Sequence, residues 1–166
     1  MMRRRLAARN RGTGTSGYTF IEVLVVSVVL LILASAAMPL ARVTMQRQRE
    51  VELRRTLREV RTAIDRYKDA ADQGIIAATD LRPGNENYPP TLEVLVEGVT
   101  KAGDATGVKL KFLRRIPVDP MTGKAEWGMR CYQDDADDKS WCGENVYDVY
   151  SKNTAKALDG TTYDTW

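Results

Sequence analysis

Few residues of this chain have the types and spacing that chemistry requires. The 166 residues include no histidine, which excludes His-based acid–base catalysis, Ser–His or Cys–His nucleophile pairs and most zinc sites. Two cysteines, Cys131 and Cys142, bracket the acidic stretch Asp134-Asp135-Ala136-Asp137-Asp138, which lacks the spacing of an EF-hand and is interpreted as a solvated loop. One more carboxylate, Glu22, stands alone at the head of an uncharged run.

The uncharged run, residues 23–41, has the length of a membrane span. As a helix it measures roughly 28 Å, enough to cross a hydrocarbon core. A carboxylate in such a helix is unfavourable by about 2.5–3.5 kcal/mol at the centre and by less near the edge. Glu22 is therefore a candidate functional residue.

The first 17 residues carry basic charge and no acid. Without their five arginines the chain's 25 basic residues fall to 20, against 22 acidic residues. The formal charge of +3 is therefore no argument for nucleic acid as a partner. We expect the arginines to hold the N-terminus in the cytoplasm and the rest outside, which is the periplasm if the cell is a diderm bacterium. They are Arg3, Arg4, Arg5, Arg9 and Arg11.

The leader does not have the order of a secretory signal peptide. A signal peptide places its apolar region before the cut, whereas the candidate cut here, after Gly17, comes before the apolar run. Cleavage at this point would keep the apolar helix on the mature protein. An uncleaved signal anchor is the alternative.

The stretch Gly17-Tyr18-Thr19-Phe20-Ile21-Glu22 resembles the prepilin-peptidase site of type IV pilins and type II secretion pseudopilins. The resemblance implies cleavage after Gly17, N-methylation of Tyr18 and a role for Glu22 in filament assembly. It also implies that the helix can kink or extend at Pro39, whose missing N–H interrupts helical bonding. The expected organisation is a cleaved leader (1–17), a long helix (18–74, with its transmembrane part at 18–41) and a periplasmic head (75–166).

Beyond Arg42 the sequence becomes amphipathic, with one apolar seam at spacings of three and four and a helix end at Gly74. We expect the seam to pack on a small sheet; a short coiled coil is the alternative. The seam consists of Leu53, Leu57, Val60, Ile64, Tyr67 and Ala71. The remaining faces are interpreted as solvated or subunit-facing, and they carry Arg47, Arg49, Arg54, Arg55, Arg58, Arg61 and Arg66 with Glu50, Glu52, Glu59, Asp65, Asp69 and Asp72.

The head has the signals of a small α+β unit. Residues 79–91 are predicted to be a loop, and residues 91–97 a short helix that Gly98 stops. Residues 109–116 fit a strand or a short helix, and residues 125–132 and 145–151 are predicted strands. The fold class is therefore α+β, pilin-like, with a long N-terminal helix packed on a three- or four-stranded antiparallel sheet.

The head also resembles one branch of the superfamily, the major pseudopilin of type II secretion systems. The matching stretches are Tyr88-Pro89, residues 113–120 (LRRIPVDP), residues 146–151 (VYDVYS), Asp159-Gly160 and Trp166. The resemblance implies calcium binding in the loop after the last strand, where Ser151, Asp159 and Asp164 lie. Lys152 and Lys156 depart from the acidic, glycine-rich stretch of the family.

The cysteine pair is expected to form a disulfide. In an oxidising compartment, two cysteines with ten residues between them predict a bond worth about 2–3 kcal/mol through loop entropy. Free buried thiols are the alternative.

The favoured function is a structural subunit and not an enzyme. It would be a single-pass inner-membrane protein that prepilin peptidase cleaves and that forms a periplasmic filament of many copies, with minor pseudopilins and an inner-membrane assembly platform as partners. The alternative is a type IV pilus subunit for adhesion, motility or DNA uptake. From another class, a membrane-anchored periplasmic enzyme or binding module is disfavoured because no nucleophile constellation is present.

Overall fold

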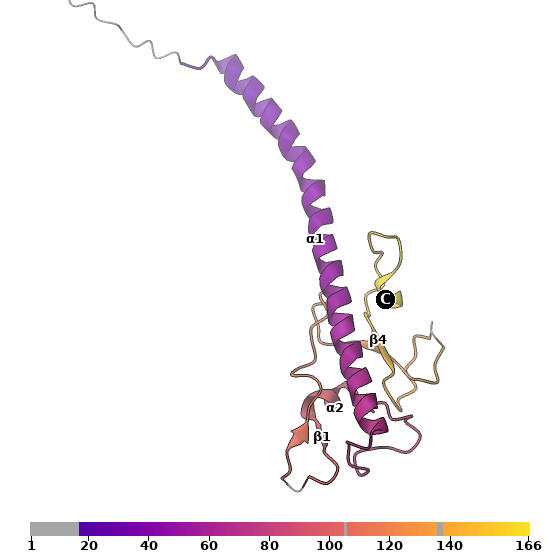
Figure 1. Cartoon of the computed structure of the whole chain (residues 1–166). Helices are drawn as coiled ribbons and strands as arrows, with labels where there is room; N and C mark the ends of the chain where they lie inside the picture. Colours follow the sequence, from indigo (N-terminus) through magenta and orange to yellow (C-terminus); the bar gives the residue numbers. More distant parts are fainter. Residues whose placement is uncertain (1–16, 105, 136–137) are drawn as a thin grey trace, which may run out of the picture. The chain divides into compact units, whose positions relative to one another are not determined.

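The computed structural model describes residues 17–104, 106–135 and 138–166, and for residues 36–40 it describes the backbone alone. The chain divides into two compact units, Met1–Arg42 and Val43–Trp166. Each unit is described by itself. Helix α1 runs through the boundary between them as one ribbon (Figure 1).

Helix α1 comprises Phe20–Asp72, 53 residues. Thr19 precedes its first residue; the carbonyl oxygen of Thr19 accepts the N–H of Val23 at 3.2 Å, and its hydroxyl accepts the N–H of Glu22 at 3.4 Å. Thr19 and Glu22 have the spacing of a capping box, in which a Thr precedes a Glu by three residues. The motif at Gly17 therefore also contains a helix start signal.

Helix α1 ends as predicted at Gly74. This glycine has φ 67°, and its N–H donates to the carbonyl of Ala71 at 2.9 Å. The N–H of Ile75 donates to the carbonyl of Ala70 at 2.9 Å, which completes a Schellman motif with Gly74 in the left-handed position. The observed helix is two residues shorter at each end than the predicted 18–74.

The first unit presents apolar side chains on every face of α1. All described side chains from Tyr18 to Ser35 are exposed, and that of Phe20 is 84% exposed. Ser27 and Ser35 donate their hydroxyls to the carbonyls of Val23 and Ile32, so their polar atoms are partnered within the helix. Within the described residues, no helix is both long and apolar enough to cross a membrane. Helix α1 includes Pro39, whose side chain lies outside the described residues.

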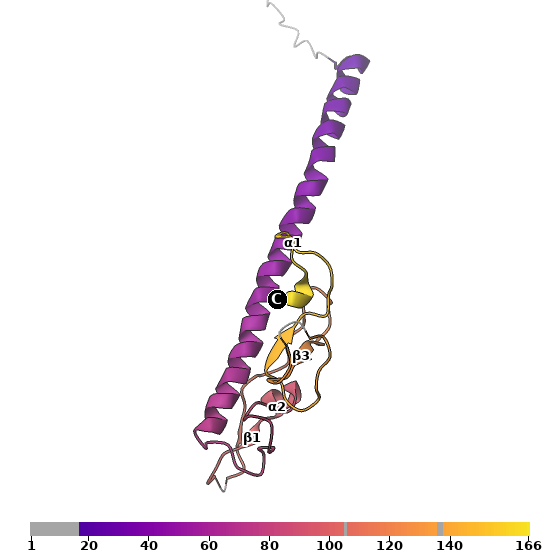
Figure 2. The ribbon, with the colours of Figure 1, turned by 90° about the vertical axis from the view of Figure 1, so that its right-hand side faces the viewer.

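The second unit has its core along the predicted seam. All six seam residues of α1 are buried, and Val60, Ile64 and Tyr67 are fully buried. They pack with Leu95 and Val149 of the head in one apolar cluster. Figures 1 and 2 show the head segments beside the C-terminal part of α1. The packing of the seam on the head is therefore confirmed.

The short helix α2, Leu92–Glu97, confirms the helix predicted at 91–97. Its C-cap is Gly98, with φ 83° and an N–H that donates to Val94 O at 2.9 Å. Leu92 and Leu95 face the core.

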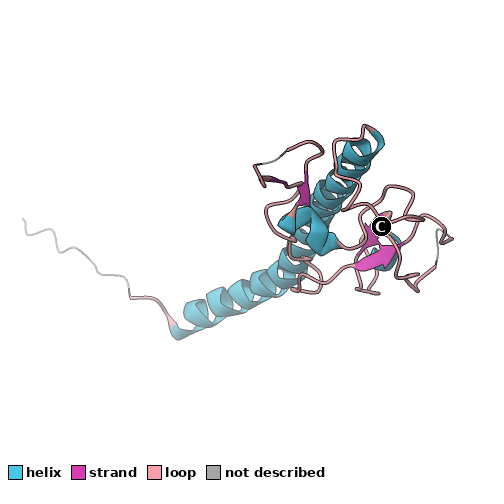
Figure 3. Ribbon diagram, turned by 90° about the horizontal axis from the view of Figure 1, so that it is seen from below, coloured by secondary structure: helices cyan, strands magenta, loops and turns pink. Residues whose placement is uncertain are grey.

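Among the described residues the strands form two separate two-stranded antiparallel sheets, so the predicted three- or four-stranded sheet is wrong. One pairs β1 (Val99–Thr100) with β2 (Lys109–Leu110), and the other pairs β3 (Gly128–Arg130) with β4 (Asp148–Tyr150). The rest of the head outside the helices is mainly loop (Figure 3).

The reason for the split lies in the segment between β2 and β3. Asp119 N–H donates to Lys124 O and Gly123 N–H to Asp119 O, so the backbone groups of this segment bond within a turn. Pro117 and Pro120 have no N–H to offer a strand partner. The two pairs of strands are thus kept apart.

Candidate functional site

The predicted processing motif, Gly17 to Glu22, lies at the start of α1 and is exposed. Gly17 lies outside any element with no heavy atom near the position of a Cβ, and Tyr18 is 78% exposed. Glu22 lies in the first turn of α1 and is also exposed. The residues that follow the expected cut, from Tyr18 onward, are therefore exposed. Residues 1–16 lie outside the described residues, so the leader itself stays a prediction.

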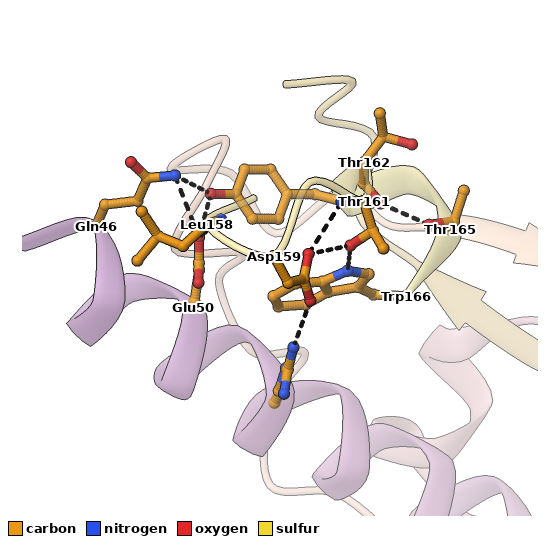
Figure 4. A network of polar contacts seen from close by, with 10 residues as sticks. Gln46, Glu50, Leu158, Asp159, Thr161, Thr162, Thr165 and Trp166 are labelled. Carbon is orange, nitrogen blue, oxygen red and sulfur yellow. Dashed lines mark hydrogen bonds and ion pairs between the residues drawn. The ribbon is translucent and has the colours of Figure 1, made fainter. Parts of the chain in front are cut away.

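The second candidate site is the last loop, which is attached to α1 by the carboxylate of Glu50. Oε1 of Glu50 accepts the N–H of Leu158 at 2.9 Å, the hydroxyl of Tyr163 at 2.8 Å and the amide of Gln46 at 3.2 Å (Figure 4). Tyr163 lies in the 3₁₀-helix η1, Tyr163–Thr165. Burial raises the pKa of Tyr163, so its hydroxyl remains a donor at neutral pH.

Glu50 corrects an expectation. The sequence predicts a solvated or subunit-facing side chain at this position, but Glu50 is buried. The signal was present, since position 50 precedes Leu53 by three residues and Leu57 by seven, which puts it on the seam. A carboxylate on an apolar seam needs partners, and the last loop supplies them.

Arg54 makes a second attachment of the last loop. Its guanidinium pairs with Asp159 at 3.2 Å and lies 4.2 Å from the ring centroid of Trp166. The pair is largely exposed, so its contribution to stability is small. The indole N–H of Trp166 donates to Thr161, which also bonds Asp159 (Figure 4).

Arg61 makes the third attachment. Its guanidinium forms a bidentate pair with Asp148 of β4, with Nε–Oδ1 at 2.6 Å and Nη2–Oδ2 at 3.2 Å. The same group donates to the carbonyls of Val149 and Trp166, both at 3.1 Å. Bidentate, charge-assisted bonds are among the stronger polar contacts in proteins. Arg54 and Arg61, seven residues apart, were expected to be solvated or subunit-facing, and the structure pairs both within the head.

The three residues predicted to bind calcium each have other partners. Ser151 donates its hydroxyl to Asp119 at 2.7 Å, and both side chains are fully buried. Asp159 pairs with Arg54, and Asp164 pairs with Lys139.

These contacts do not fit a calcium site. Calcium needs six to eight converging oxygens, and here two carboxylates are already paired with cations. One observation points the other way, since Oδ1 of Asp164 is buried with no hydrogen-bond partner among the described residues. Calcium binding by Ser151, Asp159 and Asp164 stays a prediction of the resemblance, and the arrangement of the loop does not favour it.

Hydrogen bonds lower the pKa of both carboxylates. The bond from Lys139 is the main cause for Asp164, and the bond from Thr161 is the main cause for Asp159. Both side chains are therefore ionised at neutral pH.

The structure joins Cys131 and Cys142 in the predicted disulfide, with the two Cα atoms 6.0 Å apart. Asp134 lies beside the bond, and its carboxylate accepts the N–H of Cys131 at 2.6 Å. These three residues are close enough together to surround an ion. Metals bind thiolates, however, and neither sulfur is free to become one. In the acidic stretch, Oδ1 of Asp138 accepts hydrogen bonds from the N–H and the hydroxyl of Ser140. Asp137 lies outside the described residues.

Comparison of the chain with protein-family models, with curated proteins and with solved structures finds no match.

Proposed function

We propose that this chain is a type IV pilin-like subunit, cut after Gly17 and assembled into a filament through its N-terminal helix. The observation that carries the proposal is the exposed apolar surface of α1 directly after an open Gly17. Every side chain from Tyr18 to Ser35 is exposed. Contiguous apolar surfaces of this kind usually mark membrane or protein contacts.

Two environments would cover this surface in turn. Before assembly it is the bilayer, because the uncharged run of residues 23–41 has the length of a span. After assembly it is the same helix of neighbouring copies. The arginines of the leader would keep the N-terminus in the cytoplasm and the head in the periplasm.

Glu22 would link cleavage to assembly. Cleavage creates an α-amine on Tyr18, which lies two residues before the start of α1 and four residues before Glu22. When helices bundle, the carboxylate leaves water and needs a partner, because a buried unpaired charge costs about 3–5 kcal/mol. The amine of a neighbouring copy is the cation closest to this level of the helix. Uncleaved copies lack it and would be excluded.

The head motifs support the secretion branch, in which the filament drives protein export. Prepilin peptidase, minor pseudopilins and an inner-membrane platform would be the partners. A cell that lacks this chain should fail to export proteins while keeping its surface pili. Loss of pili, of adhesion or of DNA uptake with normal export would instead assign it to a type IV pilus.

The direct test is the N-terminus of the mature protein. Sequencing should begin at Tyr18, and Gly17→Ala should leave the leader attached. The matched control is Gly14→Ala, which changes a glycine of the same leader and should leave processing intact. A mature protein that begins within or after residues 34–37 would indicate ordinary signal peptidase and contradict the proposal.

A further inference from the structure

Five arginines line one groove of the head. The groove has a volume of about 1020 Å³ and lies between α1 and the segment that follows β2. Among its described lining residues Glu59 is the one carboxylate, so the lining carries four more positive charges than negative ones. The arginines are Arg55, Arg58 and Arg66 from α1 with Arg114 and Arg115 from the segment.

The wall of the groove that faces α1, the segment after β2, is held in place by the apolar core. Leu113 is buried in the apolar cluster, and the ring of Phe112 packs 5.3 Å from that of Tyr67 on α1. The N–H groups of Phe112 and Leu113 both donate to Leu95 O, at 3.0 and 2.9 Å. Arg114 and Arg115 follow at once and are therefore held beside the helix.

The fold makes no use of these five side chains. Three other arginines of the same unit, Arg54, Arg61 and Arg130, are ion-paired, whereas Arg47, Arg49 and Arg82 lie outside the groove and have no ion pair among the described residues. Within the described part of the chain, by contrast, none of the five groove arginines has an ion pair or a side-chain hydrogen bond. Like charges on one helix face repel each other, as Arg55 and Arg58 do at a spacing of three residues. Five unpaired guanidinium groups around one groove indicate an anionic ligand.

We propose that this groove binds a small ligand that carries two or more phosphate groups. Guanidinium is planar, always charged and matched to phosphate oxygens, which it binds in a bidentate manner. The groove is larger than a single phosphate requires, and its cations come from two walls. The ligand is either a soluble polyphosphate or the headgroup of a diphosphate-bearing lipid, which offer the same chemistry.

Single-stranded nucleic acid fits the groove less well. Proteins that bind single strands combine cations with exposed aromatic rings on which bases stack. The aromatic residue here is Phe112, which is partly buried and packs on Tyr67. The three arginines of α1 also span only about 16 Å of helix axis.

The test is titration of the full chain, in uncharged detergent, with sodium tripolyphosphate at constant ionic strength. We expect saturable binding by calorimetry, and Arg114→Gln with Arg115→Gln should weaken it about tenfold or more. The matched control removes two exposed arginines outside the groove, Arg49→Gln with Arg82→Gln, and should change the affinity less than about twofold. Lysine at 114 and 115 should restore only part of the affinity, because it keeps the charge without the planar fork.

Three results would overturn the proposal. They are the absence of saturable binding, equal weakening by the control pair, and tighter binding of a single-stranded oligonucleotide than of tripolyphosphate. Micelles doped with a diphosphate-bearing lipid identify the source of the ligand. Tighter binding to these micelles than to tripolyphosphate indicates a lipid headgroup. Tighter binding to tripolyphosphate indicates a soluble ligand. The site does not depend on the proposed filament, since the groove variants should still be cut after Gly17 and still assemble.

Discussion

The phenol of Tyr163 donates a hydrogen bond to the carboxylate of Glu50 at 2.8 Å, across 113 residues of chain. The acceptor is a buried carboxylate on the main helix, and the donor is in the last turn. The Leu158 N–H meets the same oxygen at 2.9 Å. Glu50 is thus the shared acceptor for two points of the last loop.

Glu50→Ala should lower the free energy of unfolding by about 2–4 kcal/mol, because the donors of Leu158, Tyr163 and Gln46 lose a shared acceptor at once. The measurement is denaturant unfolding of the full chain in uncharged detergent. Glu52→Ala, an exposed carboxylate on the same helix, is the control and should stay within about 0.5 kcal/mol of the wild type. Tyr163→Phe should lose less than Glu50→Ala, and its effect should largely vanish in the Glu50→Ala background. Additive losses would show that the two side chains do not interact.

Reduction of the Cys131–Cys142 disulfide should lower the free energy of unfolding by about 2–3 kcal/mol, because the reduced chain gains freedom in its unfolded state. Cys142→Ser should give a similar loss. Intact protein from cells should resist alkylation until a reductant is added. Equal alkylation with and without reductant would contradict the bond.

Chelation of calcium should leave the melting temperature of the head unchanged, because Arg54 and Lys139 already pair with Asp159 and Asp164. A bound ion at a hundredfold excess over its Kd would instead stabilise the protein by about 2.7 kcal/mol. The comparison is a thermal melt with added calcium and with chelator. A lower melting temperature in chelator that Asp159→Ala abolishes would establish the calcium site.

The ion pair between Lys139 and Asp164 should make the free energy of unfolding depend on pH in the acid range. The pKa of Asp164 is lowered, mainly by the hydrogen bond from Lys139. The stabilisation is therefore complete above the unfolded pKa of about 3.9 and is lost as the pH falls through the lower folded value. Lys139→Gln should flatten this part of the pH dependence of unfolding, with a modest effect because Lys139 is mostly exposed. An unchanged slope would show that the pair does not form in solution.

Glu22→Ala should abolish filaments while membrane insertion and the melting temperature of the head stay unchanged. The reason is that Glu22 belongs to the first unit, where its side chain is exposed. Glu22→Gln keeps the shape and should lose most of the assembly, because the proposed partner is a cation. Electron microscopy of cells that express the variant alone provides the measurement. Filaments as abundant as those of the wild type would contradict the role of Glu22.

Local signals predicted most of the helical structure from sequence. The seam from Leu53 to Ala71 repeats over several turns, and Gly74 and Gly98 end their helices through a left-handed or otherwise unusual backbone that glycine adopts freely. The strand pairs were harder to predict. Each strand is two or three residues long, which is too short to show an alternation of apolar and polar residues. The hydrogen bonds of the turn at Asp119 involve backbone groups, which no hydrophobic pattern predicts.

The polar contacts of the last loop were the least predictable part of the candidate site. Position 50 could have been assigned to the seam, but its partners lie more than a hundred residues away. Arg54 and Arg61 look like Arg55 and Arg58 in sequence. Only the placement of Asp159 and Asp148 separates the paired arginines from the unpaired ones.

The three attachments at Glu50, Arg54 and Arg61 have a mechanical consequence. They lie along about 16 Å of α1, with Tyr163 bound at Glu50 and Trp166 bound at Arg61, and the last loop lies beside the helix (Figure 2). A pull along α1 would load all three contacts together in shear, so they would have to break at once and not one after another. The head should therefore resist tension along the helix much better than a sideways pull on its last residues.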